Sequence, residues 1–393
     1  MRAYLDHAAT SPMSDGVAAA YLDALRTVGN PASTHAHGQE ASDRLETARS
    51  EIAGALGCDH AELILTGGGT ESVNLALKGL FWGRRRAGSG ATILVADGEH
   101  HATLEAAEWL RDTQGATLTW LPLDAAGRLS PDTLRAAIAE AGPGEVALVS
   151  FLWANNEVGT VQPVAELCAV AAAAGIPAHV DAIAALGQIP IDFAASGAAA
   201  VSVSAHKIGG PVGVGALLLS RHAPIEPLLH GGTQQRGRSG TQDVAGAVAF
   251  AAALAESLTA DGSPRPAAVA RLRQLRDELI GGIRAIDPSA VLRGPEPGPE
   301  RLPGNAHFTF PGCQGDSLVF LLDAAGVSVS VGSACQAGVA EPSHVLRALG
   351  VPEAEAAGAL RFTLAPSTET AAIEQLLAAL PDALARARSA GLA

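Results

Sequence analysis

Short apolar segments alternate with helical segments between residues 62 and 219, and this alternation constrains the fold more than any other feature of the chain. The segments with strand-like composition span 62–65, 91–95, 118–123, 146–152, 178–180, 200–204 and 214–219. Nearly all of their residues are apolar, which is typical of strands buried on both faces of a parallel sheet. The pattern therefore predicts an α/β fold with a mostly parallel seven-stranded sheet covered by helices.

The pattern changes after residue 243. Two long helical stretches, 243–257 and 266–286, follow the alternating region, and the Pro- and Gly-rich stretch 288–301 is expected to be an exposed loop. A smaller α+β unit is expected beyond it, with elements at 307–310, 316–325, 327–330, 343–349, 360–364 and 368–387. We expect a domain boundary at about 255–265.

Composition excludes several classes of protein. The 393 residues are 48% hydrophobic and carry a net charge of −14, which favours a large core and argues against a nucleic-acid binder. No stretch approaches the roughly 18 apolar residues of a membrane helix. The four cysteines lie far apart, with neither a Cys-x-x-Cys pair nor zinc-site spacing. We therefore expect no metal site, no membrane span and free thiols in a reducing cytoplasm.

The chain contains only two lysines, Lys78 and Lys207. Arginine replaces lysine wherever a cation alone is needed, but it cannot supply the neutral amine that covalent chemistry requires. Lys207 follows an apolar strand within Ser-Ala-His-Lys-Ile-Gly-Gly, where ligands of open α/β sheets bind. It is either a Schiff-base lysine or a loop lysine. Lys78 is expected near the end of a helix, as a dipole-compensating cation.

Other polar residues also follow predicted strands. Asp181 is either a partner for a pyridinium nitrogen or a helix N-cap. The turn at 66–72 contains three glycines and opens a helix, so Gly69, Thr70 and their neighbours form a candidate site for a single phosphate. The turn lacks both the Walker and the dinucleotide spacing. His100 is either a proton-transfer residue beside a planar cofactor or a helix-start histidine.

Two residues of the C-terminal region are also candidates. Cys335 lies in a segment of small residues, and its thiol is either an exposed nucleophile or a buried, inert group. Arg361 places a guanidinium inside an apolar strand, so it needs a carboxylate from the protein or from a substrate. The other cysteines lack the setting of Cys335 and are expected to be structural.

Together these segments resemble the cysteine desulfurases of the iron–sulfur-cluster type, which are class V aminotransferases and fold-type I pyridoxal phosphate enzymes. The resemblance covers nearly the whole chain. Its motifs, in the order of the family, lie at 4–10, 29–33, 70–76, 99–100, 155–159, 179–182, 204–207, 238–241, 332–335 and 361–362. It implies a large cofactor-binding domain at 15–257, and a small domain, made of 1–14 and 258–393, that carries the cysteine loop.

The resemblance also implies a pyridoxal 5'-phosphate cofactor and roles for the matched residues. Lys207 forms the Schiff base, Cys335 attacks the substrate sulfur, and His100 stacks on the ring as acid and base. Asn155 and Arg361 bind the substrate. The remaining implied cofactor contacts are Gly69, Thr70, Asn156, Asp181 (at the pyridine nitrogen), Ser204, His206 and Thr241, the last of them from the other subunit of a homodimer.

The implied reaction removes sulfur from L-cysteine, leaving L-alanine and a persulfide on Cys335. The persulfide passes to a sulfur-acceptor protein, either an iron–sulfur scaffold or a thiolation relay. A selenocysteine lyase or an aminotransferase is the alternative, and Cys335 favours the desulfurase because transamination needs no thiol. The chain departs from the family at Ala184, where a glutamine usually donates to the cofactor's phenolic oxygen, and also at Val331 and 365–367.

Overall fold

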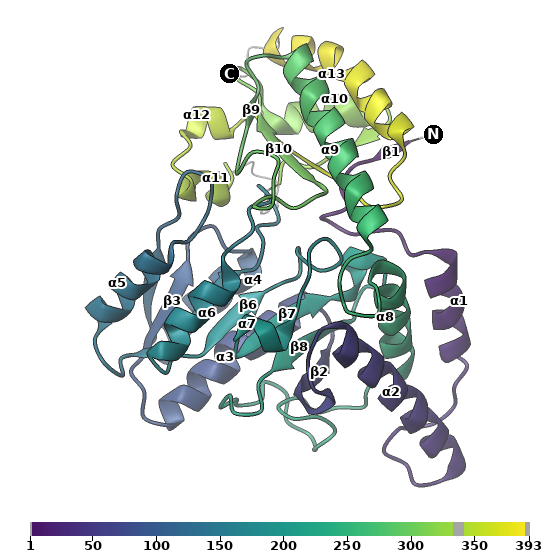
Figure 1. Cartoon of the computed structure of the whole chain (residues 1–393), viewed down its shortest axis with the longest axis vertical. Helices are drawn as coiled ribbons and strands as arrows, with labels where there is room; N and C mark the ends of the chain where they lie inside the picture. Colours follow the sequence, from purple (N-terminus) through teal and green to yellow (C-terminus); the bar gives the residue numbers. More distant parts are fainter. Residues whose placement is uncertain (1, 333–341, 390–393) are drawn as a thin grey trace.

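The computed structural model describes residues 2–332 and 342–389, and it folds into a large α/β unit beneath a smaller α+β unit (Figure 1). The large unit contains a seven-stranded sheet with the order β2-β8-β7-β6-β5-β3-β4. Strand β8 runs antiparallel to both of its neighbours, and the other pairs are parallel. The predicted fold class is confirmed. The strands are β2 (Leu63–Thr66), β3 (Thr92–Ala96), β4 (Thr117–Leu121), β5 (Val146–Leu152), β6 (Ala178–Asp181), β7 (Ala200–Ser204) and β8 (Gly215–Leu219).

Helices cover both faces of this sheet because successive strand residues point to opposite sides. In β3, Leu94 joins one hydrophobic core, whereas Ile93 and Val95 join the other. The first core packs against α2 (Ala36–Ala55), α5 (Pro131–Ala141), α6 (Val164–Ala173) and α8 (Val244–Ser257). The second packs against α3 (Gly69–Arg86) and α4 (His101–Gln114). The apolar runs of the strands thus reflect burial on two faces.

The smaller unit has its own core. An antiparallel sheet with the order β12-β10-β9 packs with α9 (Pro266–Ile286), α10 (Gly315–Ala324) and α13 (Thr370–Ser389) around Phe308, Phe362 and Leu376. These strands are β9 (Val291–Leu292), β10 (Asn305–Thr309) and β12 (Ala359–Thr363), and β1 (Ala3–Tyr4) pairs with β11 (Val327–Ser328) beside them. The remaining helical elements are α1 (Asp15–Ala24), η1 (His60–Glu62), α7 (Phe193–Ser196), η2 (Ala205–Ile208), α11 (His344–Ala348) and α12 (Glu353–Ala356). No helix among the described residues is long and apolar enough to cross a membrane.

The prediction of an exposed loop at 288–301 is wrong in part. The stretch contains β9, and Arg301 at its end is 1% exposed. The Arg301 guanidinium donates to the backbone carbonyls of Arg293 and Pro295. Backbone carbonyls therefore accept hydrogen bonds from a charged side chain that the sequence predicted would face water. Burial also lowers the pKa of Arg301 to about 9.

The segment 5–9 crosses between the two units. Leu5 N–H donates to Ser328 O, and the N–H of Thr363 donates to Leu5 O at 2.8 Å. Ala8 N–H then bonds the hydroxyl of Thr363. The segment therefore lies along the junction where strand ends of the large unit face β12 of the small unit.

Candidate active site

A cavity of about 440 Å³ lies at this junction, at the carboxyl ends of β5, β6 and β7. Parallel strands present their carboxyl ends at one edge of a sheet, so Leu152, Asp181 and Ser204 all border the cavity. Nine of the predicted site residues line it: Gly69, Thr70, His100, Asn156, Asp181, Ser204, His206, Lys207 and Arg361.

Lys207 lies in η2, directly after β7, and its side chain reaches the segment 5–9. The Nζ donates to the carbonyl of Ala8 and to that of Ala9 at 3.0 Å. Burial lowers the pKa of Lys207 to about 8; the nearby Arg361 charge also lowers it, whereas the Asp181 and Asp6 charges raise it. A sizeable fraction of Lys207 is therefore the neutral, nucleophilic amine near pH 8.

Two buried carboxyl groups lie behind Lys207. Asp181 is 2% exposed, its Oδ1 accepts the N–H of Ile183, and burial raises its pKa to about 6. It is therefore mostly ionised at pH 7. Glu99 is 1% exposed and accepts the N–H of Leu152 at 2.8 Å; burial, and then the Asp181 charge, raise its pKa well above the ordinary value. Asp181 is thus the carboxylate that carries negative charge into this part of the cavity.

His100 caps α4, and this contact fixes the form of its ring. Its Nδ1 accepts the N–H of Ala102 at 3.1 Å, so the proton of the neutral imidazole sits on Nε2. Burial, followed by the Lys207 charge, lowers the pKa of His100 to about 4. At pH 7 the ring is therefore neutral and has a proton to donate from Nε2.

The part of the cavity lined by the start of α3 and by Ser204 suits an anion. Helix α3 begins at Gly69, and the N–H groups of its first turn have no carbonyl within the helix to bond. The hydroxyl of Ser204 is buried and has no partner among the described residues. A Cβ built on Gly69 would lie 2.3 Å from Ile183 Cδ1 and 3.5 Å from Ser204 Cβ, so this first residue of α3 packs closely against Ser204. Thr70 and His206 also line the cavity.

Arg361 has a carboxylate partner within the protein, Asp6. Its Nη2 bonds Asp6 Oδ1 at 2.8 Å, and its Nη1 donates to the carbonyl of Asn156 at 3.2 Å. The Nε is buried without a partner among the described residues. The guanidinium is therefore held in place by the protein, and these two bonds leave it further N–H donors beside the cavity.

Asn155 and Thr241 do not line the cavity. The Asn155 amide donates to Gly98 O, and its oxygen accepts the N–H groups of Glu157 and Val158. Its side chain therefore shapes the backbone that carries Asn156, and the contact of Asn155 with a substrate stays a prediction. Thr241 belongs to a segment that contacts the first turn of α3 through Arg238 and Glu71, outside the cavity.

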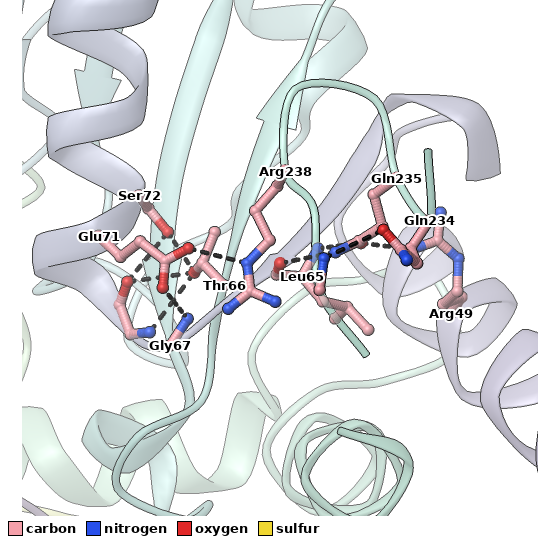
Figure 2. A network of polar contacts seen from close by, with 11 residues as sticks. Arg49, Leu65, Thr66, Gly67, Glu71, Ser72, Gln234, Gln235 and Arg238 are labelled. Atoms are coloured by element: carbon pink, nitrogen blue, oxygen red, sulfur yellow. Dashed lines mark hydrogen bonds and ion pairs between the residues drawn. The ribbon is translucent and has the colours of Figure 1, made fainter. Parts of the chain in front are cut away.

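This segment, 229–241, is held against the edge strand β2 (Figure 2). The Gln235 side chain accepts from Leu65 N–H at 2.7 Å and donates to Leu65 O at 3.0 Å, so it makes the bonds that a further strand would make. Arg49 donates to the same Gln235 oxygen. Arg238 binds Glu71 in the first turn of α3.

Cys335 lies outside the described residues. Of the other cysteines, Cys168 and Cys313 are buried and Cys58 is partly buried. Burial raises the pKa of both Cys58 and Cys168 to about 12, so they are protonated and poor nucleophiles at pH 7. Their surroundings agree with the structural role expected of them.

Sequence reasoning assigned no role to several residues at the cavity. These are His7, Glu99, His101, Glu157, Gln188, Asn305 and His344. Asp6 was also missed, although an arginine in an apolar strand signals a carboxylate partner. The signal did not identify that partner, because Asp6 lies 355 positions from Arg361 in the sequence.

Comparison with known proteins identifies the family. The aminotransferase class-V family model matches residues 3–376. An IscS-like cysteine desulfurase of Mycobacterium tuberculosis is 51% identical, over 100% of this chain and 98% of that protein. Cysteine desulfurase IscS of Dictyoglomus turgidum is 39% identical, over 92% of this chain and 89% of that protein.

Solved structures agree with these relatives. A NifS-like protein superposes with a TM-score of 0.88 at 32% identity, covering 98% of this chain and 100% of that one. SspA in complex with cysteine gives a TM-score of 0.79 at 30% identity, covering 94% and 100%. Sequence identity along the whole chain and the shared fold lead to one assignment: the chain belongs to the aminotransferase class-V family, among its cysteine desulfurases.

Proposed function

We propose that this cysteine desulfurase holds pyridoxal 5'-phosphate on Lys207 and transfers the sulfur of L-cysteine to Cys335, releasing L-alanine. The convergence of Lys207, Asp181 and Ser204 on one cavity carries the proposal. Class-V aminotransferases and cysteine desulfurases are pyridoxal phosphate enzymes as a family.

The residues of the cavity fit this cofactor. The buried hydroxyl of Ser204, which has no hydrogen-bond partner within 2–332 and 342–389, lies beside the first turn of α3, and both suit a phosphate. The ionised Asp181 suits a protonated ring nitrogen. Lys207 would hold the cofactor covalently, Asn156 would contact its phenolic oxygen, and His100 would stack on the ring. Gly69, Thr70, His206 and the partner subunit's Thr241 would complete the phosphate site.

The protein's own groups would then divide the reaction among them. The bound cofactor supplies an electron sink for the bonds at the substrate Cα. Arg361, oriented by Asp6, binds the substrate carboxylate, and the Lys207 Nζ takes the Cα proton. His100, neutral at pH 7, would donate a hydrogen bond from Nε2, since its Nδ1 accepts the N–H of Ala102 at the helix N-terminus.

Cys335 supplies the sulfur-accepting step. Its thiolate would attack the substrate sulfur, so that an S–S bond forms while the C–S bond breaks; the electron pair of the broken bond stays on the substrate carbon, and protonation makes it the methyl group of alanine. With the protons returned, L-cysteine and one thiol become L-alanine and one persulfide, so no outside oxidant or reductant is needed.

The proposal includes assembly and location. Thr241 lies outside the cavity of its own protomer, which supports a homodimer in which each subunit completes the other's site. A persulfide needs an acceptor, which we propose is an iron–sulfur scaffold protein or a thiolation relay. A thiol nucleophile also needs a reducing compartment, and we propose the cytoplasm.

Incubation of the purified protein with L-cysteine tests the proposal, with sulfide and alanine as the readouts. Cys335→Ala should abolish sulfur release yet keep the cofactor absorbance, and Lys207→Ala should lose the absorbance. Cys58→Ala is the matched control and should retain activity. Near-wild-type alanine and sulfide from Cys335→Ala would contradict the role of the thiol.

A further inference from the structure

An ion pair lies beside the Gly-rich turn that opens α3 (Figure 2). Arg238 Nε donates to Glu71 Oε1 at 3.0 Å, and Gly67 N–H donates to Glu71 Oε2 at 2.6 Å. The Arg238 and Glu71 side chains are 20% and 25% exposed. One carboxylate therefore joins an otherwise distant arginine to the backbone of the turn.

Hydrogen bonds within segment 229–241, and from it to β2, fix the position of Arg238. Gln235 fixes 229–241 to Leu65, and Gly240 N–H donates to the Gln234 side chain at 3.0 Å. Arg238 forms isolated bridges with both Leu229 and Gln235. These contacts lie on both sides of Arg238 in the segment, so its position is set before any ligand arrives.

The negative charge of Glu71 has two opposing effects at this turn. Glu71 lies in the first turn of α3, next to Gly69 and Thr70, which border the anion end of the cavity. A carboxylate there stabilises the positive end of the helix, but it repels an incoming phosphate. Arg238 supplies the opposite charge on the same carboxylate.

We propose that Arg238 is a positioning residue that raises the phosphate affinity of the Gly67–Thr70 turn by neutralising and holding Glu71. The inference rests on the proposed function, because it assigns the anion end of the cavity to the cofactor phosphate. Arg238 itself does not border the cavity, so it acts through Glu71 and not by touching the ligand.

Two probes that differ only in the phosphate test the inference. The full-length protein, with its cofactor removed, is titrated with pyridoxal 5'-phosphate and separately with pyridoxal, and binding is followed by absorbance. Arg238→Gln should weaken pyridoxal 5'-phosphate by about tenfold, because it leaves a partly buried carboxylate uncompensated. Pyridoxal binding should change by less than about twofold.

The paired variant supplies the readout that a merely structural role would not give. Glu71→Gln combined with Arg238→Gln removes both charges and should return the affinity to within about threefold of the wild type. Arg238→Lys keeps the charge and should also bind within about threefold, even if Arg238→Gln is poorly folded. Arg86→Gln, which removes an exposed charge from the far end of α3, is the matched control.

Three results would overturn the inference: unchanged pyridoxal 5'-phosphate affinity in Arg238→Gln, equal weakening of both probes, or no recovery in the paired variant. A wild-type protein that binds neither probe would instead refute the proposed function. The two failures are therefore distinguishable.

Discussion

The amine of Lys207 lies in a cavity whose burial disfavours its protonated, charged form. Burial is the main reason that its pKa falls to about 8, and the Arg361 guanidinium adds to the effect. With the cofactor removed, acetylation of Lys207 by acetic anhydride should rise with pH and level off above about pH 8. Acetylation of added Nα-acetyl-lysine, whose amine has a pKa near 10.4, should continue to rise above pH 8. Mass spectrometry of the Lys207 peptide gives the profile.

The sign of the Arg361 contribution provides a check on this cause. Arg361→Gln removes a positive charge near the amine, so the labelling midpoint of Lys207 should move to higher pH. A midpoint near 10.4 in the wild type, or a downward shift in Arg361→Gln, would contradict this account of the lysine.

The sequence predicted which residues lie at the cavity better than it predicted which residues they bind. Lys207 and Asp181 could be predicted because each lies at or just past the carboxyl end of an apolar strand, and strand ends meet at one edge of the sheet. The pairing of Arg361 with Asp6 could not, since it depends on the packing of segments 355 residues apart. Asn155 was expected to contact the substrate, but its amide is used by local backbone groups.

At the scale of the element, Gln235 makes the two hydrogen bonds that join segment 229–241 to strand β2. Gln235→Ala would leave the Leu65 N–H without its acceptor, which costs about 1–3 kcal/mol for a buried group. We therefore expect trypsin to cleave after Arg236 and Arg238 about tenfold faster than in the wild type. Electrophoresis with mass spectrometry measures the rate. Gln114→Ala, at an exposed glutamine, is the control.

Equal cleavage of Gln235→Ala and the wild type would show that other contacts suffice to hold the segment.

The strands themselves were predictable because burial on two faces leaves almost no polar positions. The stretch 288–301 was not, because its proline and glycine content signals a turn but says nothing about the carbonyls that surround Arg301.

At the scale of the whole molecule, the proposed composite sites predict complementation between inactive proteins. Lys207→Ala and Thr241→Ala should each be impaired as homodimers. In a mixed dimer, the subunit that keeps Lys207 receives an intact Thr241 from its partner. Dissociation and reassociation of the mixture should therefore restore desulfurase activity to about a quarter of the wild type, if subunits pair at random and half of the dimers gain one complete site. Activity that stays at the sum of the parents would exclude a Thr241 contribution between subunits.

The segment 5–9 also has a consequence for the order of events during synthesis. Leu5 and Ala8 bond to Ser328 and Thr363, which the ribosome adds more than 300 residues later. The carbonyls that hold Lys207 therefore have no fixed place until β12 has been made and paired. The sheet of the large unit can form while the chain is still growing, but the junction between the units is necessarily assembled last. A chain that stalls before residue 363 can carry every strand of that sheet and still lack a finished cavity.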